Sequence, residues 1–357
     1  MDTLKKLRNL IDILKDKAPL IKATLSTKRH ASSITVAVLH ATTHNSPYPP
    51  SEKRVAAVLA FGHGSRLTAC ACIEVLMDRL HDTHSASVAL KCLFTIHNVI
   101  TRGSFILKDQ LSFYPSSGGR NFLNLSTFRD NSNVEMWELS YWVRWYAGLL
   151  ELSLMISRVL GYYFYSSSCK DNKDKADKVL SLFNSDLSRE IDVLVDFTER
   201  ICEAPDLHFQ RNNLVYEVVR MVSEDYSLVQ SEILVRVVEL GNRMENMSYG
   251  ELTQFLNPLK RLEDCKEKLL LLFVNREMND GLWDLISQMK KKVLMVKGKR
   301  EEVKLVMVRM GHRDESISES ARFRKQFAES GQLFRFTSGS GEWLGLDRVS
   351  LPVSTVR

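Results

Sequence analysis

Apolar residues recur at intervals of three and four along most of this chain, up to about residue 296. An α-helix turns about once every 3.6 residues, so this spacing gathers the apolar side chains on one helical face that can be buried. Residues that commonly cap helices stand where such runs begin, among them Ser51, either Thr83 or Ser85, and Ser248. No segment alternates apolar and polar residues over the length of a strand. The sequence therefore predicts an all-α protein.

The predicted helices divide into two sets. Shorter helices are expected at 33–40, after Ser51, at 67–81 and at 88–101, followed by a long helix at 134–165. The second set is longer and more heptad-like, as in an antiparallel bundle, and is expected at 176–182, 187–202, 214–222, 228–247, 249–274 and 280–296. We therefore expect helical domains at 1–165 and 176–296, joined by a polar linker at 166–175. Residues 297–357 are expected to form a largely disordered tail, because their mixture of Ser, Gly, charges and isolated aromatic residues cannot bury a core.

The formal net charge of +6 is unevenly distributed. Residues 1–30 carry a net charge of +5 and residues 290–357 one of +7, so the body between them is acidic. Basic ends on an acidic body can face an anionic surface, either lipid or nucleic acid, without the whole protein adhering to it. No finger spacing, recognition-helix pattern or aromatic single-strand platform accompanies the basic residues. This favours lipid over nucleic acid.

Neither a membrane span nor a disulfide framework is expected. The most apolar long segment, 147–165, is interrupted by Glu151 and Arg158, and Met1 is not followed by the short apolar core of a signal peptide. The six cysteines have no framework spacing, which fits reduced thiols in the cytosol. These observations predict a cytoplasmic protein that meets a membrane only at its surface.

The segment from residue 40 to residue 54 is the strongest candidate for a binding site. It reads HATTH at 40–44, continues through a loop with three prolines, and ends in SEKR at 51–54, at the start of an apolar helical run. A prolyl loop cannot continue a helix, so it turns the chain back on itself. Cations, imidazoles and the unpaired N–H groups of a helix start suit phosphate groups. The expected site residues are His40, His44, Ser51, Lys53 and Arg54. The alternative is an ordinary basic helix start that binds nothing in particular.

This layout resembles the lipid-binding signature of the clathrin-assembly ANTH family, in which a Lys-Ala-Thr element is followed, across a proline loop, by a Lys-x-Lys/Arg-His element. Further stretches are similar to the family in the same order: KCLFTIH at 91–97, LNLSTFRD at 123–130 and WVRWY at 142–146. SGGR at 117–120 resembles the insertion of the short plant-type branch. The resemblance covers the first 165 residues closely and the region to about residue 296 loosely.

The resemblance implies an ENTH/ANTH-like right-handed helical superhelix, extended by the long-helix bundle. It also implies a non-enzymatic adaptor that binds phosphatidylinositol bisphosphate headgroups and links membrane, or vesicle R-SNARE cargo, to clathrin and an adaptor complex. Such a protein is peripheral on clathrin-coated pits and vesicles, at the plasma membrane or Golgi apparatus. Two positions depart from the signature, since His40 and Ser51 stand where the family has lysines. The alternative is a protein-interaction scaffold of the same fold that has lost strong lipid binding.

Both ends of the chain carry secondary candidates. An apolar stripe at 4–25 is expected to pack on the following helices or, over residues 4–14, to lie in a lipid interface. The lysines around it are candidate membrane-surface contacts: Lys5, Lys6, Lys15 and Lys17. In the tail, the segment WLGLD is a near-match to the leucine-rich clathrin box of the resembled family, through Trp343, Leu344, Leu346 and Asp347.

The sequence shows no arrangement typical of a catalytic or metal site. Cys70 and Cys72 lie two residues apart, which places the thiols on different faces of a helix, and no second pair has zinc spacing. The segment GHGS at 62–65 lacks the strand-to-helix setting of a nucleophile elbow. The glycine pair at 118–119 lacks the Lys-Ser/Thr pair of a P-loop. We therefore expect no enzymatic activity and no cofactor.

Overall fold

The computed structural model describes residues 11, 13–21, 29–44, 48–115, 123–163, 165, 177–205, 212–273 and 280–311. Helices dominate these residues, and none of them lies in a strand. The prediction of an all-α protein is therefore confirmed. Among the same residues, no helix is both long enough and apolar enough to cross a membrane. The predicted linker at 166–175 and residues 312–357 of the predicted tail lie outside the described residues. Residues 297–311, predicted as the beginning of that tail, are helical instead.

The chain divides into two compact units, residues 1–300 and 301–357. Residues 13–21 are helical, and the next elements are α2 (Arg29–Ala41), α3 (Glu52–Leu59), the 3-10 turn η1 (Ala60–His63), α4 (Arg66–Asp82), α5 (Ala86–Arg102) and α6 (Phe105–Ser112). The elements that follow are α7 (Val134–Leu160), α9 (Asn184–Cys202), α10 (Asn213–Arg243), the 3-10 turn η3 (Met244–Asn246), α11 (Tyr249–Leu272) and α12 (Asp280–Gly311). The part of the second unit that the structure describes, residues 301–311, is helical.

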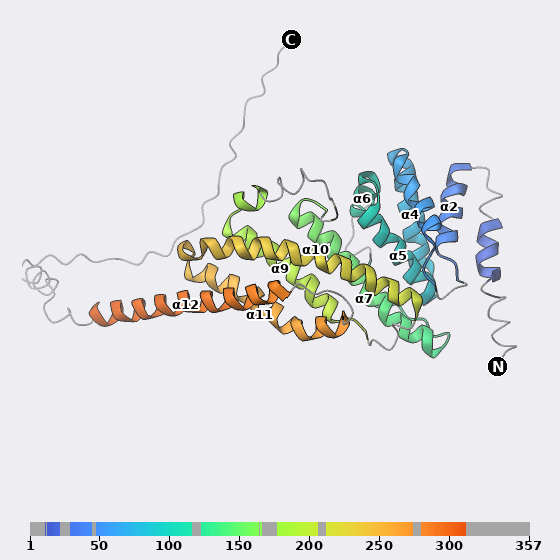
Figure 1. Ribbon diagram of the computed structural model, residues 1–357. Coiled ribbons are helices and arrows are strands. Elements are labelled where there is room, and N and C mark those ends of the chain that lie inside the picture. The colour runs from blue at the N-terminus through green and yellow to red at the C-terminus, as the bar shows by residue number, and fades with distance from the viewer. Residues whose placement is uncertain are drawn as a thin grey trace, which may run out of the picture. The chain divides into compact units, whose positions relative to one another are not determined.

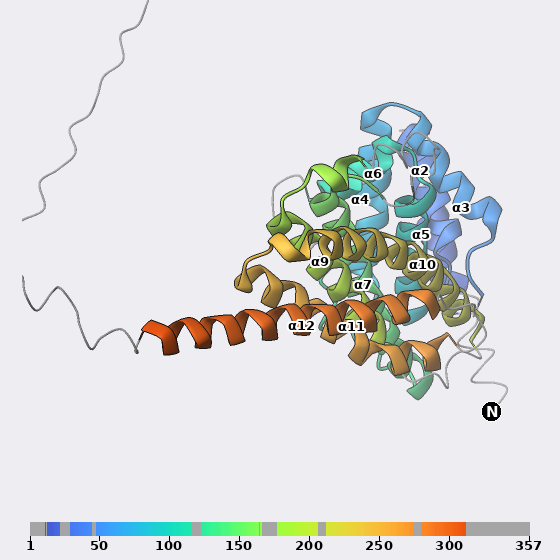
Figure 2. The ribbon, with the colours of Figure 1, turned by 60° about the vertical axis from the view of Figure 1, so that its left-hand side comes forward.

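Successive helices of the first unit pack against one another in a stack. α2 packs on α3 and α4, α4 packs on α5, α5 packs on α7, and α7 packs on α9 (Figure 1). α9 in turn packs against both α10 and α11. Figure 2 shows α9, α7 and α5 following one another behind α10. This offset succession is a superhelical array of helices.

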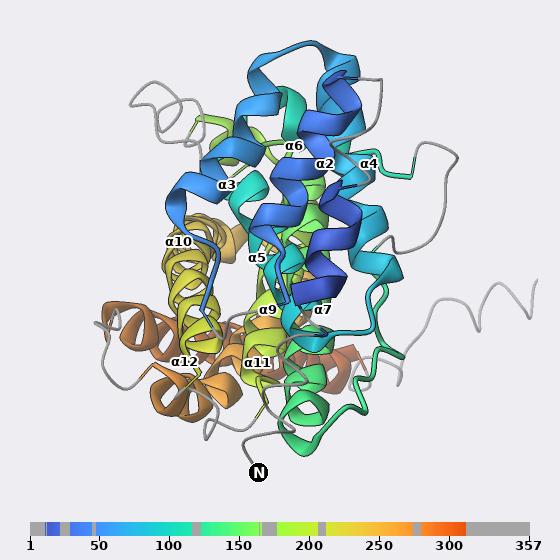
Figure 3. The same ribbon diagram turned by 90° about the vertical axis from the view of Figure 1, so that its right-hand side faces the viewer.

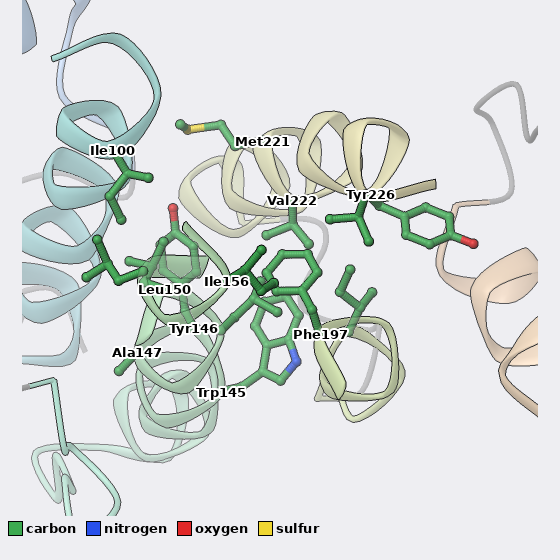
Figure 4. Close-up of a cluster of buried hydrophobic side chains, with 14 of the residues drawn as sticks. Ile100, Trp145, Tyr146, Ala147, Leu150, Ile156, Phe197, Met221, Val222 and Tyr226 are labelled. Atoms are coloured by element: carbon green, nitrogen blue, oxygen red, sulfur yellow. The ribbon is translucent and has the colours of Figure 1, made fainter. Parts of the chain in front are cut away.

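The centre of the stack is α5, whose residues from Val88 to Ile100 are all buried. A helix that is covered on every side belongs in the interior of a protein. Figure 4 shows Ile100 of α5 beside Tyr146 and Leu150 of α7, with Phe197 of α9 and Val222 of α10 beyond them. One continuous apolar core therefore joins helices of the two predicted sets.

The structure corrects several helix boundaries, and two of the corrections have a clear physical cause. The helices predicted at 214–222 and 228–247 are a single helix, α10. The polar residues between them continue the helix because Asp225 is buried against His97 of α5, at 2.9 Å, and the Ser227 hydroxyl donates to the Ser223 carbonyl at 3.1 Å. The helix predicted to run to residue 165 ends at Leu160, because Gly161 adopts a φ of 73°, a left-handed conformation that terminates helices.

Gly62 is a position where the packing tolerates no side chain. A Cβ atom there would lie 2.3 Å from Ser104 Oγ and 2.6 Å from Leu107 Cδ1, and Leu107 is fully buried. We expect Gly62→Ala to lower the free energy of unfolding by about 1–3 kcal/mol in urea titrations, because overpacking forces its neighbours to shift. Gly250→Ala is the matched control, since the nearest atom to its new Cβ is 3.9 Å away. Equal stability of the two variants would contradict the packing described for Gly62.

Candidate functional site

The predicted binding segment connects α2 to α3, and Figure 3 views the molecule from the side of these helices. The end of α2 is closed by Thr42, whose buried hydroxyl donates to the Val38 carbonyl at 2.7 Å. His40 lies in the last turn of α2 and is exposed to solvent. Between the helices the structure describes residues 42–44 and 48–51, and Pro50 is buried. The loop is therefore anchored on both sides of the segment 45–47, which lies outside the described residues.

His44 is bound to an acidic residue that the sequence analysis did not include. Its Nδ1 lies 2.6 Å from Asp16 Oδ1, and its backbone N–H donates to Asp16 Oδ2 at 2.9 Å. Burial alone would raise the pKa of Asp16, but the hydrogen bonds and charge of His44, with the charge of Arg79, lower it below its usual value. The side chain of His44 is only 10% exposed. The structure thus holds His44 in the loop instead of presenting it beside the exposed His40.

Two cations of neighbouring helices hold the backbone of the same loop. Lys91 of α5 donates from Nζ to the Thr43 carbonyl at 2.8 Å, and Arg79 of α4 donates to the Thr42 carbonyl at 3.3 Å. Burial lowers the pKa of Lys91 to about 8, against an opposing effect of Asp16, and the charge of Arg54 lowers it further. Arg54 therefore lies close enough to the loop to act on the amine beneath it. Lys91 belongs to the segment KCLFTIH that resembles the family, but nothing in the sequence predicts its contact with the loop.

The start of α3 presents its cations to solvent. Ser51 is the N-cap residue, as predicted, but its hydroxyl makes no capping hydrogen bond; its carbonyl instead accepts from the N–H groups of Arg54 and Val55, at 2.9 and 3.1 Å. Ser51, Lys53 and Arg54 are all exposed. Within the described part of the chain, no carboxylate forms an ion pair with Lys53 or Arg54. A hydroxyl and two cations are thus exposed within the first turn of one helix, and a helix start suits an anion.

The one acid in the SEKR segment is paired with an arginine from α5. Arg102 donates from Nη1 and Nη2 to the two carboxylate oxygens of Glu52, at 2.6 and 3.2 Å. Both side chains are largely exposed, so this pair contributes little to stability. Its main consequence is electrostatic, because Glu52 no longer opposes the charges of Lys53 and Arg54. Nothing in the sequence indicated Arg102, which is 50 residues away from Glu52.

The helix at residues 13–21 contacts the loop through its acidic face. Asp16 points to His44, whereas Lys15 and Lys17 are exposed. The apolar stripe is also exposed over its described part, where Ile11, Leu14 and Ile21 are 46%, 65% and 57% exposed. The expectation that this stripe packs on the following helices is therefore wrong for these side chains. Lys5 and Lys6 lie outside the described residues, as does the clathrin-box-like segment with Trp343, Leu344, Leu346 and Asp347.

The burial of Lys91 predicts a specific pH dependence. The unfolded chain keeps the proton of Lys91 up to about pH 10, whereas the folded protein loses it near pH 8. Between these values the unfolded state binds more protons, so the contribution of Lys91 to stability rises with pH. We expect the free energy of unfolding of the parent, minus that of Lys91→Met, to increase by about 1 kcal/mol or more from pH 7.5 to pH 9.5. A difference that stays constant or falls in urea titrations would contradict this account of Lys91.

The cysteine pair of α4 shows no sign of a shared ligand. Cys72 is buried and its thiol faces the Val58 carbonyl at 3.8 Å, whereas Cys70 donates to Glu74 at 3.5 Å. Across the residues that the structure describes, no three His, Cys, Asp or Glu side chains are grouped to hold a metal ion. His97, on α5, contacts the Tyr146 hydroxyl at 2.7 Å and Asp225 at 2.9 Å inside the core.

Comparison with known proteins places these features in context. The sequence model of the ANTH domain matches residues 33–270. "Putative clathrin assembly protein At4g40080" of Arabidopsis thaliana is 40% identical over 99% of this chain and 99% of its own length. "Putative clathrin assembly protein At5g10410" of the same plant is 33% identical, over 79% of this chain and 84% of its own length. "Putative clathrin assembly protein At5g65370", also from this plant, is 28% identical over 80% of this chain and 99% of its own length.

Proposed function

Because the chain belongs to the ANTH-domain clathrin-assembly family, in its plant-type branch, we propose that it is a clathrin-related endocytic adaptor recruited to membranes by phosphoinositides. The proposed ligand is the headgroup of phosphatidylinositol bisphosphate. The proposed site is the exposed start of α3, with Ser51, Lys53 and Arg54, together with His40 at the end of α2. Lys15 and Lys17 are proposed as further contacts with the membrane surface.

The observation that carries this proposal is the state of Lys53 and Arg54. Both are exposed, and neither is ion-paired to a carboxylate that the structure describes, while the neighbouring Glu52 is neutralised by Arg102. Exposed, uncompensated cations beside free helix-start N–H groups are suited to phosphate groups. The Ser51 hydroxyl, which does not cap the helix, can donate to the same phosphate.

The remaining parts of the proposed function follow from the family. The protein would be peripheral on coated pits and vesicles, at the plasma membrane or Golgi apparatus, and would link clathrin to membrane, adaptor complex or vesicle R-SNARE cargo. Clathrin itself would be contacted through Trp343, Leu344, Leu346 and Asp347. Pull-down of clathrin by the parent chain, and its loss in Leu344→Ala with Leu346→Ala, would test that segment. Undiminished capture by the variant would exclude it.

One observation favours a second candidate function, a protein-interaction scaffold that has lost strong lipid binding. The imidazole of His44 is engaged by Asp16, and His40 and Ser51 replace lysines of the family signature. Sedimentation with vesicles separates the two functions. An adaptor would pellet more strongly with phosphatidylinositol bisphosphate than with phosphatidylserine at equal membrane charge, whereas a scaffold would pellet weakly and equally with both.

His40→Lys is expected to strengthen vesicle binding by about tenfold at pH 7.5, because a lysine adds a charge-assisted contact with a phosphate group. His40→Gln should bind no better than the parent. The control is His63→Lys, which adds the same charge at another exposed histidine, in η1. If His40→Lys and His63→Lys raise binding equally, the gain reflects net charge and His40 is not part of the site.

A further inference from the structure

A cavity of about 490 Å³ opens beside the start of α3. Its walls come from the proline loop before α3, from one side of α5 and from the first half of α10. Figure 2 shows α3, α5 and α10 on the same side of the molecule. The residues of the proposed phosphoinositide site that lie on α3, Lys53 and Arg54, are not among its lining residues. The cavity is therefore a separate feature that shares an edge with that site.

The charged lining of the cavity is acidic. Four carboxylates and two guanidinium groups belong to it: Glu52, Glu217, Glu224, Asp225, Arg102 and Arg220. Arg102 is paired with Glu52, so that pair is neutral. Arg220 is shared by two acids, Glu217 at 2.7 Å and Glu224 at 2.5 Å, which leaves one negative charge in excess.

Asp225 adds a further carboxylate to the wall formed by α10. The residue is only 1% exposed, and its Oδ2 lies 2.9 Å from His97 Nε2. Its Oδ1 makes no hydrogen bond of normal geometry with any described residue. The neighbouring Tyr165 hydroxyl also lies close, since burial and then the charge of Asp225 raise its pKa. A buried carboxylate therefore borders the cavity.

Apart from Asn98, Thr101 and Tyr165, the uncharged part of the lining is apolar and suits the stem of a long side chain. Pro49 and Pro50 form one wall, Met221 and Leu228 lie on α10, and Phe94 contributes from α5. Lysine and arginine side chains bury their methylene stems along such surfaces while the charged head meets a carboxylate. An aromatic ring adds attraction for a cation that lies over its face. An anion, by contrast, would meet more carboxylates than guanidinium groups.

We propose that this cavity binds a lysine or arginine side chain of a partner polypeptide. The binding itself is independent of lipid. The identity of the partner rests on the proposed function: if the start of α3 lies on a membrane, the cavity lies near its surface, where the cytoplasmic flanks of membrane proteins are rich in lysine and arginine. The partner would then be a membrane-anchored protein that presents such a basic flank.

The test is a lipid-free titration that follows the methyl group of Met221. The chain is labelled with ¹³C at its methionine methyl groups, and the Met221 signal is assigned from Met221→Leu. The probes are an acetylated Gly-Ser-Arg-Gly-Ser amide and the same peptide with citrulline, which keeps the shape of arginine without its charge. We expect the arginine peptide to shift the Met221 signal to saturation, and the citrulline peptide to leave it in place.

Glu224→Gln should weaken the arginine peptide about tenfold, since it removes one charge-assisted contact. Glu224 is 62% exposed, so this variant should fold normally. The matched control is Glu203→Gln, at a similarly exposed glutamate that pairs with Arg200 away from the cavity. Equal shifts by both peptides, no shift by either, or equal affinity of Glu224→Gln and parent would overturn the proposal. A Met221 shift caused by inorganic phosphate alone would make the cavity an anion site and would overturn it as well.

Discussion

Reversing both charges at the start of α3, with Lys53→Glu and Arg54→Glu, is expected to weaken binding to phosphatidylinositol bisphosphate vesicles by about a hundredfold or more. Each charge-assisted contact with a phosphate contributes about 1.5–3 kcal/mol, and the new carboxylates would also repel the headgroup. The melting temperature should stay nearly unchanged, because both side chains are exposed and neither is ion-paired with a described carboxylate. Vesicle sedimentation and thermal unfolding of the same preparation measure the two effects.

The control for this experiment changes the net charge by the same amount elsewhere. Arg189 on α9 and Lys260 on α11 are exposed, and neither forms an ion pair with the part of the chain that the structure describes. Arg189→Glu with Lys260→Glu should retain most of the binding. An equal loss in both double variants would show that binding depends on net charge alone. Unchanged binding by the α3 variant would move the site to other cations, of which Lys15 and Lys17 are exposed.

Replacing Arg236 by methionine is expected to lower the free energy of unfolding by about 3–5 kcal/mol, because it leaves the buried carboxylate of Glu190 and the partly buried one of Glu232 without their cationic partner. Arg236 is 1% exposed and donates to Glu190 at 2.7 Å and to Glu232 at 2.6 Å. It also donates to the Tyr162 hydroxyl at 3.1 Å, which joins α10 to the end of α7. Burial alone would lower the pKa of Arg236, but Tyr162, Glu232 and Glu190 raise it above its usual value.

Arg220→Met is the matched control for the Arg236 network. Like Arg236, Arg220 contacts two glutamates, in this case Glu217 and Glu224 of its own helix, but its side chain is 43% exposed. The substitution should therefore lower the free energy of unfolding by less than about 1 kcal/mol. Urea unfolding at neutral pH distinguishes the two variants. A loss below about 1 kcal/mol in Arg236→Met would mean that water reaches Glu190, contrary to its burial in the structure.

The fold could be predicted because its signals are local. The capping residue Ser248 begins α11 through a capping box with Glu251, and Ser51 begins α3, as their positions in the sequence indicated. The sequence failed at α10, where polar residues suggested a break. A local pattern could not reveal that Asp225 is buried against His97 on another helix. Because this contact places a polar residue in the interior, the helix continues through the polar segment.

The candidate site was predicted only in part, because its charges depend on tertiary contacts. The exposure of Lys53 and Arg54 at a helix start followed from the pattern of SEKR. The pairing of His44 with Asp16 spans 28 residues, and the contact of Lys91 with the loop spans 48. Neither separation along the chain corresponds to the spacing of residues within one helix or turn. The sequence therefore does not indicate that a carboxylate contacts His44.

The most direct test of the central proposal is a crystal structure of the chain with the soluble headgroup inositol 1,4,5-trisphosphate. The predicted result is a headgroup at the start of α3, with phosphate oxygens within hydrogen-bond distance of Lys53 Nζ, the Arg54 guanidinium and Ser51 Oγ. Binding should leave the contact between His44 and Asp16 in place. A headgroup bound at other cations, or a crystal saturated with ligand in which the start of α3 stays empty, would contradict a phosphoinositide site there.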